Sequence, residues 1–188
     1  MDRPPRLLGP EAMALDPQLS LAAALEPSPI VSVHFFFGSE VSIEEQEIAL
    51  VESRAQWIFD RFAATGREED RGHLVIVVSA ARELARLPRD RIESEMLADL
   101  RAVVPSARAR APRRTLVVTE WEATYSAAVE TERRRPAAET RIGGLFLAGD
   151  ACASGWPATM EGAVRAGLAA ARAAAARLGS RSVAEPRA

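Results

Sequence analysis

The sequence has no lysine, one cysteine and two histidines among its 188 residues. Because Cys152 has no second cysteine to pair with, an internal disulfide is excluded, and a reducing compartment, the bacterial cytoplasm, is expected. His34 and His73 with a lone cysteine are too few for a metal site, so we expect no metal. All 24 cationic residues are arginines, which is typical, together with the abundant alanine, of a GC-rich bacterial genome.

Long apolar runs are also missing, since none approaches the ~20 residues that a helix needs to cross a bilayer. The N-terminus has prolines and acidic residues where a signal peptide has a basic region and an apolar core, so we expect no signal peptide. A net charge of −2 gives no attraction for nucleic acid. A hydrophobic content of 48% excludes a disordered chain, and the length suits one domain or two small lobes.

The Gly-x-Gly-x-x-Gly turn that holds the pyrophosphate of a dinucleotide is absent as well. In Rossmann-like proteins this turn joins the first strand to the first helix, and its glycines let the backbone approach the phosphates. The dinucleotide-binding half of such a fold is therefore not expected within this sequence.

What the sequence does contain is a series of strand patterns. Residues 30–37 alternate, and one face of this strand carries Val31, Val33, Phe35 and Phe37. Residues 73–79 are apolar throughout, which predicts a strand buried on both faces, and residues 116–121 form a third strand. Residues 47–60 favour further strand, with the apolar part at Trp57, Ile58 and Phe59.

Two helices are predicted before the C-terminal region. Asp16 and Pro17 provide a cap and a first-turn proline for a short helix that runs to Leu25. Pro88 opens a longer helix to about Val103, whose apolar face contains Ile92, Met96, Leu97 and Leu100.

The most informative stretch is the last one. Residues 145–148, Leu-Phe-Leu-Ala, are typical of a buried strand, which ends at Gly149 and Asp150. After a loop, a long alanine-rich helix begins near residues 158–160. The face expected to pack carries Met160, Val164, Leu168, Ala171, Ala175 and Leu178. A ligand oxygen is favoured where such a strand ends and the N–H groups of a helix begin.

Residues 144–150, Gly-Leu-Phe-Leu-Ala-Gly-Asp, and residues 155–164, Gly-Trp-Pro-Ala-Thr-Met-Glu-Gly-Ala-Val, resemble a known motif. It is the C-terminal flavin-binding motif of the FAD-dependent amine oxidase and phytoene desaturase superfamily. Within that superfamily the chain is most similar to the squalene-associated, desaturase-like branch, the hydroxysqualene dehydroxylases of hopanoid synthesis. The resemblance covers roughly residues 27–172. It departs after Asp150, where the family usually carries an aromatic residue and hydroxyls and this chain has Ala151, Cys152 and Ala153.

The resemblance implies an α/β fold. It would combine an α+β substrate lobe with the C-terminal strand and helix of a Rossmann-like FAD-binding domain, without the N-terminal dinucleotide-binding half. The implied segments are an N-terminal helical linker at 1–26, the substrate lobe at 27–140, the flavin-binding strand, loop and helix at 141–178, and a disordered tail at 179–188.

The resemblance also implies which residues contact FAD. The set is Gly149, Asp150, Gly155, Trp156, Pro157, Thr159, Met160 and Glu161. Asp150 would hydrogen-bond the ribityl or phosphate part, although without the resemblance it is a turn cap. N–H groups at the helix start would face the flavin pyrimidine carbonyl. Trp156 would either pack beside the isoalloxazine or fill the core. No catalytic residue is assigned, and Cys152 is expected as small filler.

The implied function is the FAD-dependent conversion of a squalene-type isoprenoid, hydroxysqualene to squalene. Two alternatives stay open: a fragment of a carotenoid desaturase or amine oxidase, and a catalytically silent scaffold or lipid-binding remnant. An active enzyme would need a second polypeptide that carries the dinucleotide half. Phe35, Phe36, Phe37 and Trp57 are either core or a channel for the isoprenoid. Arginines at 108–114 and 133–135 are expected on the surface, with contact to anionic lipid at the inner membrane face as the alternative.

Overall fold

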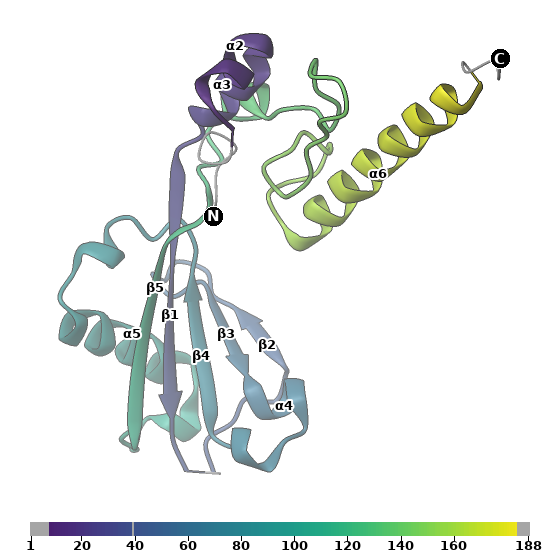
Figure 1. Ribbon diagram of the computed structural model, residues 1–188. Helices are drawn as coiled ribbons and strands as arrows, with labels where there is room; N and C mark the ends of the chain where they lie inside the picture. The colour runs from purple at the N-terminus through teal and green to yellow at the C-terminus, as the bar shows by residue number, and fades with distance from the viewer. Residues whose placement is uncertain (1–7, 39, 184–188) are drawn as a thin grey trace. The chain divides into compact units, whose positions relative to one another are not determined.

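The computed structural model describes residues 8–38 and 40–183, with side chains described as far as residue 179. The chain divides into two compact units. Unit 1 combines residues 1–27 with residues 124–188, and unit 2 comprises residues 28–123. Unit 2 contains the sheet, and unit 1 contains the stretch that resembles the flavin-binding motif (Figure 1).

A five-stranded sheet in the order β2-β3-β4-β1-β5 is the centre of unit 2. The strands are β1 (Pro27–Phe36), β2 (Glu47–Ala49), β3 (Trp57–Asp60), β4 (His73–Val78) and β5 (Arg114–Tyr125). The β1/β4, β3/β4 and β2/β3 pairings are antiparallel. β4 lies between β1 and β3, which confirms the interior position that its continuous apolar sequence predicts.

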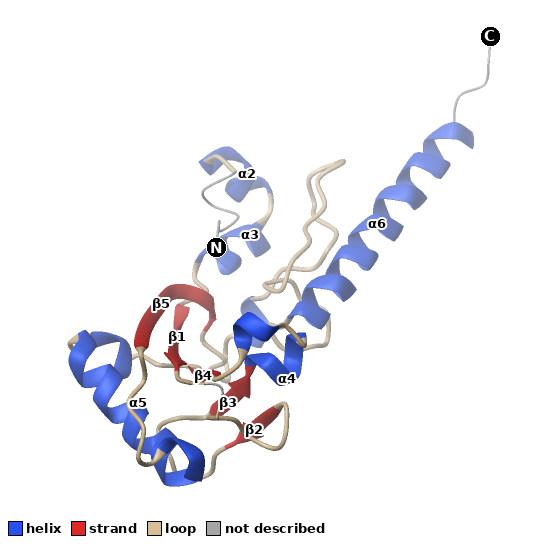
Figure 2. Ribbon diagram, turned by 90° about the horizontal axis from the view of Figure 1, so that it is seen from below, coloured by secondary structure: helices blue, strands red, loops and turns tan. Residues whose placement is uncertain are grey.

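One face of this sheet is buried under α5 (Arg89–Val103), and the short helix α4 (Arg61–Thr65) lies on the opposite side (Figure 2). Alternation along β1 buries Val31, Val33 and Phe35 on the core face, as predicted. Helix α5 contributes Ile92, Met96 and Leu100 at helical spacing, which confirms its predicted face. Each such side chain stabilises the unit by about 1.5–3 kcal/mol through burial.

The turn between β3 and β4 is built from local hydrogen bonds. The carboxylate of Asp60 caps α4 by accepting from the N–H groups of Phe62 (2.9 Å) and Ala63 (3.2 Å). Gly66, with φ of 69°, ends the helix in a left-handed conformation. A 3₁₀ turn, η1 (Glu68–Asp70), then leads into β4.

Unit 1 contains the helices α2 (Pro10–Leu15), α3 (Pro17–Ala23) and α6 (Met160–Val183), with the 3₁₀ turn η4 (Glu132–Arg134). Asp16 caps α3 through the N–H of Gln18 at 3.1 Å, which confirms the predicted helix start. Helix α2 lies within residues 1–26, which were expected as a helical linker, although no separate helix was predicted before Asp16. Helix α6 extends into the segment 179–188 that was expected as a tail, of which residues 184–188 lie outside the described residues.

The prediction of a buried strand at residues 145–148 is wrong. This segment forms a single isolated bridge, between Phe146 and Glu139, and its side chains are half-buried or exposed. A strand buried on both faces needs paired strands at its sides and covering layers, and the described part of unit 1 provides neither. Two other bounds also differ: residues 47–60 form two strands joined by a loop, and the third predicted strand extends to Tyr125.

The prediction for the packed face of α6 is wrong as well. Its larger apolar side chains are exposed: Met160, Val164, Leu168 and Leu178. The contacts of α6 instead use its small residues, because Gly162, Ala166 and Ala170 are buried. Small residues let the preceding loop lie directly against the helix backbone, and nothing in the described chain covers the larger ones.

Candidate functional site

All the residues predicted to contact a cofactor lie in one loop–helix segment of unit 1, residues 149–162, and Arg135 holds its loop in place. The side chain of Arg135 is fully buried and donates to three main-chain carbonyls. These belong to Asp150 (3.1 Å), Cys152 and Trp156 (2.8 Å). The planar fork of a guanidinium suits several converging acceptors, so one side chain fixes the course of the loop.

The expectation that residues 133–135 all lie on the surface is wrong for Arg135. Its guanidinium also pairs with the carboxylate of Glu132 at 2.8 Å and lies 5.3 Å from the ring centre of Tyr125. A buried arginine is tolerated when most of its donors are matched; both Nη atoms of Arg135 have acceptors, while its buried Nε has none in the described part of the chain. Its partners here are mostly carbonyls distant in sequence, so no local pattern marks this residue, and sequence reasoning missed it.

Two glycines give the loop its turns. Gly149 has φ of 126° and Gly155 has φ of 69°, values at which a side chain is strained. The N–H of Cys152 donates to the carbonyl of Gly149 at 3.1 Å and closes the first turn. A third glycine is required by close approach, since a Cβ on Gly162 would lie 2.4 Å from the carbonyl oxygen of Pro157.

The start of α6 leaves two donors unpaired. Thr159 accepts from the N–H of Gly162 through its hydroxyl (3.1 Å) and from the N–H of Ala163 through its carbonyl (3.0 Å). Within residues 8–38 and 40–183, no acceptor is hydrogen-bonded to the N–H groups of Met160 and Glu161. Such groups carry partial positive charge and bind a carbonyl or anionic oxygen, which is the fit that a flavin carbonyl requires.

Trp156 is 44% exposed, so it does not fill the core of unit 1. Its ring centre lies 4.6 Å from the guanidinium carbon of Arg165, and Arg165 pairs with Glu161 at 2.6 Å. This pairing, four residues apart on one helix face, gives Glu161 the role of a first-turn acid. Aromatic and charged side chains are therefore both present at the surface beside the unpaired donors.

Asp150 is half-buried, and its carboxylate has no hydrogen-bond partner in the described part of the chain. The other residues of the predicted set are also accessible to solvent. Gly149 is half-buried, while Gly155, Pro157, Thr159 and Met160 are exposed. The structure thus presents all the predicted contact residues at the surface of unit 1. Their contacts with FAD stay a prediction.

Cys152 is 4% exposed, and burial raises the pKa of its thiol. A raised pKa keeps the thiol protonated and poorly nucleophilic. The expectation that Cys152 is a small filler is consistent with this environment.

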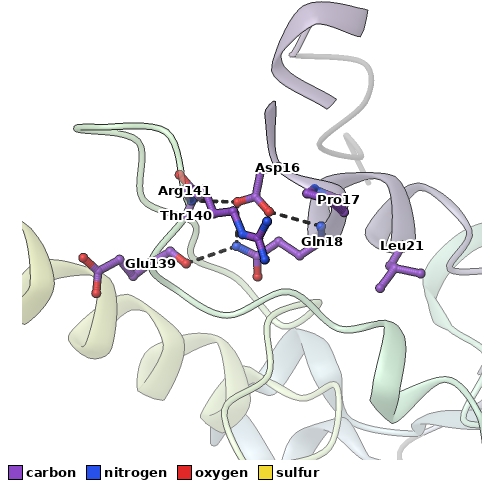
Figure 3. A pocket seen from close by; sticks show the side chains of 7 residues that line it. All are labelled: Asp16, Pro17, Gln18, Leu21, Glu139, Thr140 and Arg141. Atoms are coloured by element: carbon purple, nitrogen blue, oxygen red, sulfur yellow. Dashed lines mark hydrogen bonds between the residues drawn. The ribbon is translucent and has the colours of Figure 1, made fainter. Parts of the chain in front are cut away.

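Another hollow of unit 1, of about 500 Å³, is lined by Asp16, Pro17, Gln18, Leu21, Glu139, Thr140 and Arg141 (Figure 3). The buried carboxylate of Asp16 accepts from the N–H of Arg141 at 2.8 Å and from the side-chain amide of Gln18 at 2.9 Å. Gln18 also donates to the carbonyl of Glu139 at 3.1 Å. These hydrogen bonds join α3 to residues 137–141. Because they and the N–H of Gln18 occupy both carboxylate oxygens of Asp16, Asp16 is not available to bind a ligand in this hollow.

Two further kinds of feature are absent from the described residues, 8–38 and 40–183. No group of three or more histidine, cysteine, aspartate or glutamate side chains there could hold a metal ion. No helix within those ranges is long and apolar enough to cross a membrane.

Comparison with known proteins agrees with the resemblance of the loop–helix segment. The family model for flavin-containing amine oxidoreductases matches residues 6–175. A hydroxysqualene dehydroxylase of Zymomonas mobilis is 33% identical over 76% of this chain and 31% of its own length. Another, from Sinorhizobium fredii, is 31% identical over 73% of this chain and 30% of its own length. The chain thus spans about a third of the length of these curated relatives.

A solved structure shows the same fold at low sequence identity. It is that of a protein described as a protoporphyrinogen oxidase from Exiguobacterium sp. 255-15, with a TM-score of 0.59 and 16% identity. The likeness covers 90% of this chain and 39% of that protein. The mixed helix and antiparallel-sheet architecture is therefore shared with it, and, with the family match over residues 6–175, the chain belongs to the flavin-containing amine oxidoreductase family.

Proposed function

We propose that this chain supplies the flavin-ring side of an FAD site in an oxidoreductase that acts on a squalene-type isoprenoid. The observation that carries the proposal is the pair of unpaired N–H groups of Met160 and Glu161, next to a loop that Arg135 fixes. Family membership supports FAD as the cofactor. The two hydroxysqualene dehydroxylases support hydroxysqualene as substrate and squalene as product.

Bound FAD would supply hydride transfer, while the residues of the chain supply orientation and electrostatics. The N–H groups of Met160 and Glu161 donate to the pyrimidine carbonyl of the flavin and stabilise negative charge on it. The unpaired carboxylate of Asp150 accepts from a hydroxyl of the ribityl chain. Gly149 leaves the backbone open to close approach, and Trp156 offers an aromatic face.

The exposed apolar face of α6 is, in this proposal, covered by further polypeptide. Met160 is 89% exposed, and Val164, Leu168 and Leu178 are 57%, 54% and 68% exposed. A row of large apolar side chains in water is typical of a surface that another part of a protein covers. We assign this cover to a dinucleotide-binding half, on the same polypeptide or on a second one. We place the enzyme in the cytoplasm. Because the substrate is a lipid, we also infer peripheral contact with the inner membrane.

Turnover by a reconstituted complex tests the substrate. The chain is co-expressed with a polypeptide of the same family that carries a strand, a Gly-x-Gly-x-x-Gly turn and a helix. The flavin is reduced, and hydroxysqualene is offered, with phytoene under oxidising conditions as the comparison. We expect squalene from hydroxysqualene and no product from phytoene.

Each other outcome assigns a different function. Conversion of phytoene alone would contradict the squalene-type substrate and favour a carotenoid desaturase. No flavin binding by any co-expressed pair would contradict the enzyme itself and favour the scaffold or lipid-binding remnant.

A further inference from the structure

The two histidines of the chain, 39 residues apart, lie next to each other on β1 and β4. The register pairs His34 with Val75 and Phe36 with His73, which puts both imidazoles on the sheet face opposite α5, called here the outer face. Nδ1 of His34 lies 3.0 Å from Nε2 of His73. The ring of Phe36 stacks on His73 with the ring centres 4.1 Å apart and fixes its orientation.

A carboxylate lies beside the His73 end of this pair. Nδ1 of His73 lies 3.5 Å from one carboxylate oxygen of Asp70. The other oxygen accepts from the hydroxyl of Thr65 at 2.6 Å, and this hydrogen bond lowers the pKa of Asp70. Asp70 is therefore an ionised group, which accepts hydrogen bonds and donates none.

An acceptor at one end determines where every proton of the pair lies. Because Asp70 only accepts, the proton of neutral His73 is on Nδ1, and its Nε2 is an acceptor. The 3.0 Å contact then requires a proton on Nδ1 of His34. Nε2 of His34 is left with its lone pair, so the Asp70–His73–His34 chain ends in a hydrogen-bond acceptor.

The surroundings keep both imidazoles neutral at neutral pH. Burial lowers the pKa of His34, and the charges of His73 and Arg61 lower it further. Burial also lowers the pKa of His73, with Arg61 acting in the same direction and Asp70 and Asp60 opposing. The net direction is downward for both groups, so the proton placement of the neutral chain applies.

Around this acceptor the outer face combines apolar side chains with two arginines: Arg61, whose charge acts on both imidazoles, and Arg114, whose guanidinium carbon lies 5.2 Å from the ring centre of Phe36. The register aligns His34 with Val75 and Phe59 in one row, and the next row contains Trp57 and Val77. Trp57 is 41% exposed, and its ring stacks on Phe59 with centres 6.1 Å apart. Ser32, two residues before His34, adds one hydroxyl to the same face. Helix α4 lies on this side of the sheet near the β3–β4 turn (Figure 2).

We propose that the outer face binds an isoprenoid alcohol whose hydroxyl donates a hydrogen bond to Nε2 of His34. The aromatic and branched side chains contact the hydrocarbon, and the acceptor selects a ligand that carries a donor. The isoprenoid class of this ligand rests on the proposed function. The selection of a hydroxyl over an ether or a bare hydrocarbon rests on the Asp70–His73–His34 chain alone.

Imidazole NMR on the chain tests the proton placement, and two histidines give a spectrum of four nitrogens. We expect protonated Nδ1 and unprotonated Nε2 for both rings at neutral pH. Farnesol, an isoprenoid alcohol, presented in a non-ionic detergent should shift the Nε2 resonance of His34. Farnesyl methyl ether, which has no donor, should leave it in place. A protonated Nε2 on His34, or equal shifts with both ligands, would overturn the proposal.

The substitution Asp70→Asn should reverse the positions of the protons on the two imidazoles. The amide can accept from Thr65 and donate to Nδ1 of His73, so the protons of both rings move to Nε2. The wild-type chain should bind the alcohol about 2- to 12-fold more tightly than the ether, as one hydrogen bond allows. In Asp70→Asn this preference should disappear.

Glu69→Gln is the matched control, since it removes the same charge from an exposed neighbour, and the preference for the alcohol should stay. A preference unchanged in Asp70→Asn would overturn the proposal. The wild-type spectra and the alcohol-to-ether ratio decide it even if a variant fails to fold. None of these measurements involves flavin, so a failed flavin test of the proposed function leaves their outcome independent.

Discussion

At the scale of single residues, the three carbonyl oxygens that meet on Arg135 come from both sides of the Cys152 turn. We expect Arg135→Ala to destabilise unit 1 by about 3 kcal/mol, because buried carbonyls lose their donor. Hydrogen exchange should accelerate in residues 149–157. Arg135→Lys should recover only part of the loss, since an ammonium lacks the planar fork.

Arg133→Ala is the control for this prediction. Arg133 is exposed and pairs with Glu130 at 3.6 Å, so its removal should change the free energy of unfolding by less than about 0.5 kcal/mol. Equal effects of the Arg133 and Arg135 substitutions would show that the buried guanidinium does not organise the loop.

Asp16 gives unit 1 a dependence on acid. Burial alone would raise the pKa of its carboxyl, but hydrogen bonds from the N–H of Arg141 and from Gln18 outweigh this, and the pKa is lowered. A carboxyl whose pKa is lower in the folded state stabilises that state at pH values above its unfolded-state pKa of about 3.9. This stabilisation is lost as the pH falls through the folded-state pKa. We expect the contribution of Asp16 to be complete at neutral pH and to disappear below about pH 4.

Urea midpoints measured from about pH 2 to about pH 7 test this linkage. Asp16→Asn keeps the shape of the side chain without its charge, so the difference in stability between wild type and variant should shrink in acid. A difference that is constant across the range would contradict the assignment.

At the scale of elements, two glycines of α6 should respond in opposite directions to alanine. Gly162→Ala places a Cβ 2.4 Å from the Pro157 carbonyl oxygen and should cost about 1–3 kcal/mol as the loop moves away. Gly167→Ala meets nothing within 4 Å and should stabilise the helix by about 0.5–1 kcal/mol. Thermal melting of both variants measures the signs. Destabilisation by Gly167→Ala as well would mean that α6 packs differently.

The sequence predicted elements well where their partners lie inside the chain. β1, β4 and α5 were predicted from periodicity because the sheet and its covering helix are both complete in unit 2. Residues 145–148 and the large apolar face of α6 were predicted to be buried, but the former are half-buried or exposed and the latter is exposed. Periodicity predicts which face of an element is apolar enough to be buried. Whether that face is buried also depends on another element that packs against it.

The candidate site was also predicted only in part, namely where it depends on residues close together in the sequence. The loop–helix segment was predicted from its motif, and its glycine conformations and helix cap fit that prediction. Arg135 and the His34–His73 pair were missed, because each depends on contacts between residues distant in sequence. Such contacts leave no periodic or spacing signal in a single sequence.

At the scale of the whole molecule, the chain presents the residues predicted to form one set of cofactor contacts, and it spans about a third of the length of its curated relatives. A few backbone hydrogen bonds contribute about 0.5–1.5 kcal/mol each. Immobilising a large ligand costs several kcal/mol. We therefore expect the purified chain to be colourless and to bind FAD weakly.

Flavin absorbance of the co-expressed complex, compared among three forms of the chain, tests the central claim most directly. Wild type with a dinucleotide-binding half should give a yellow complex that keeps its flavin on gel filtration. Asp150→Ala should lose flavin, whereas Cys152→Ala, which truncates a buried side chain two residues away in the same turn, should retain it. Stoichiometric FAD on the isolated chain, or retention unaffected by Asp150→Ala, would contradict the assignment of residues 149–162 as one side of a shared flavin site.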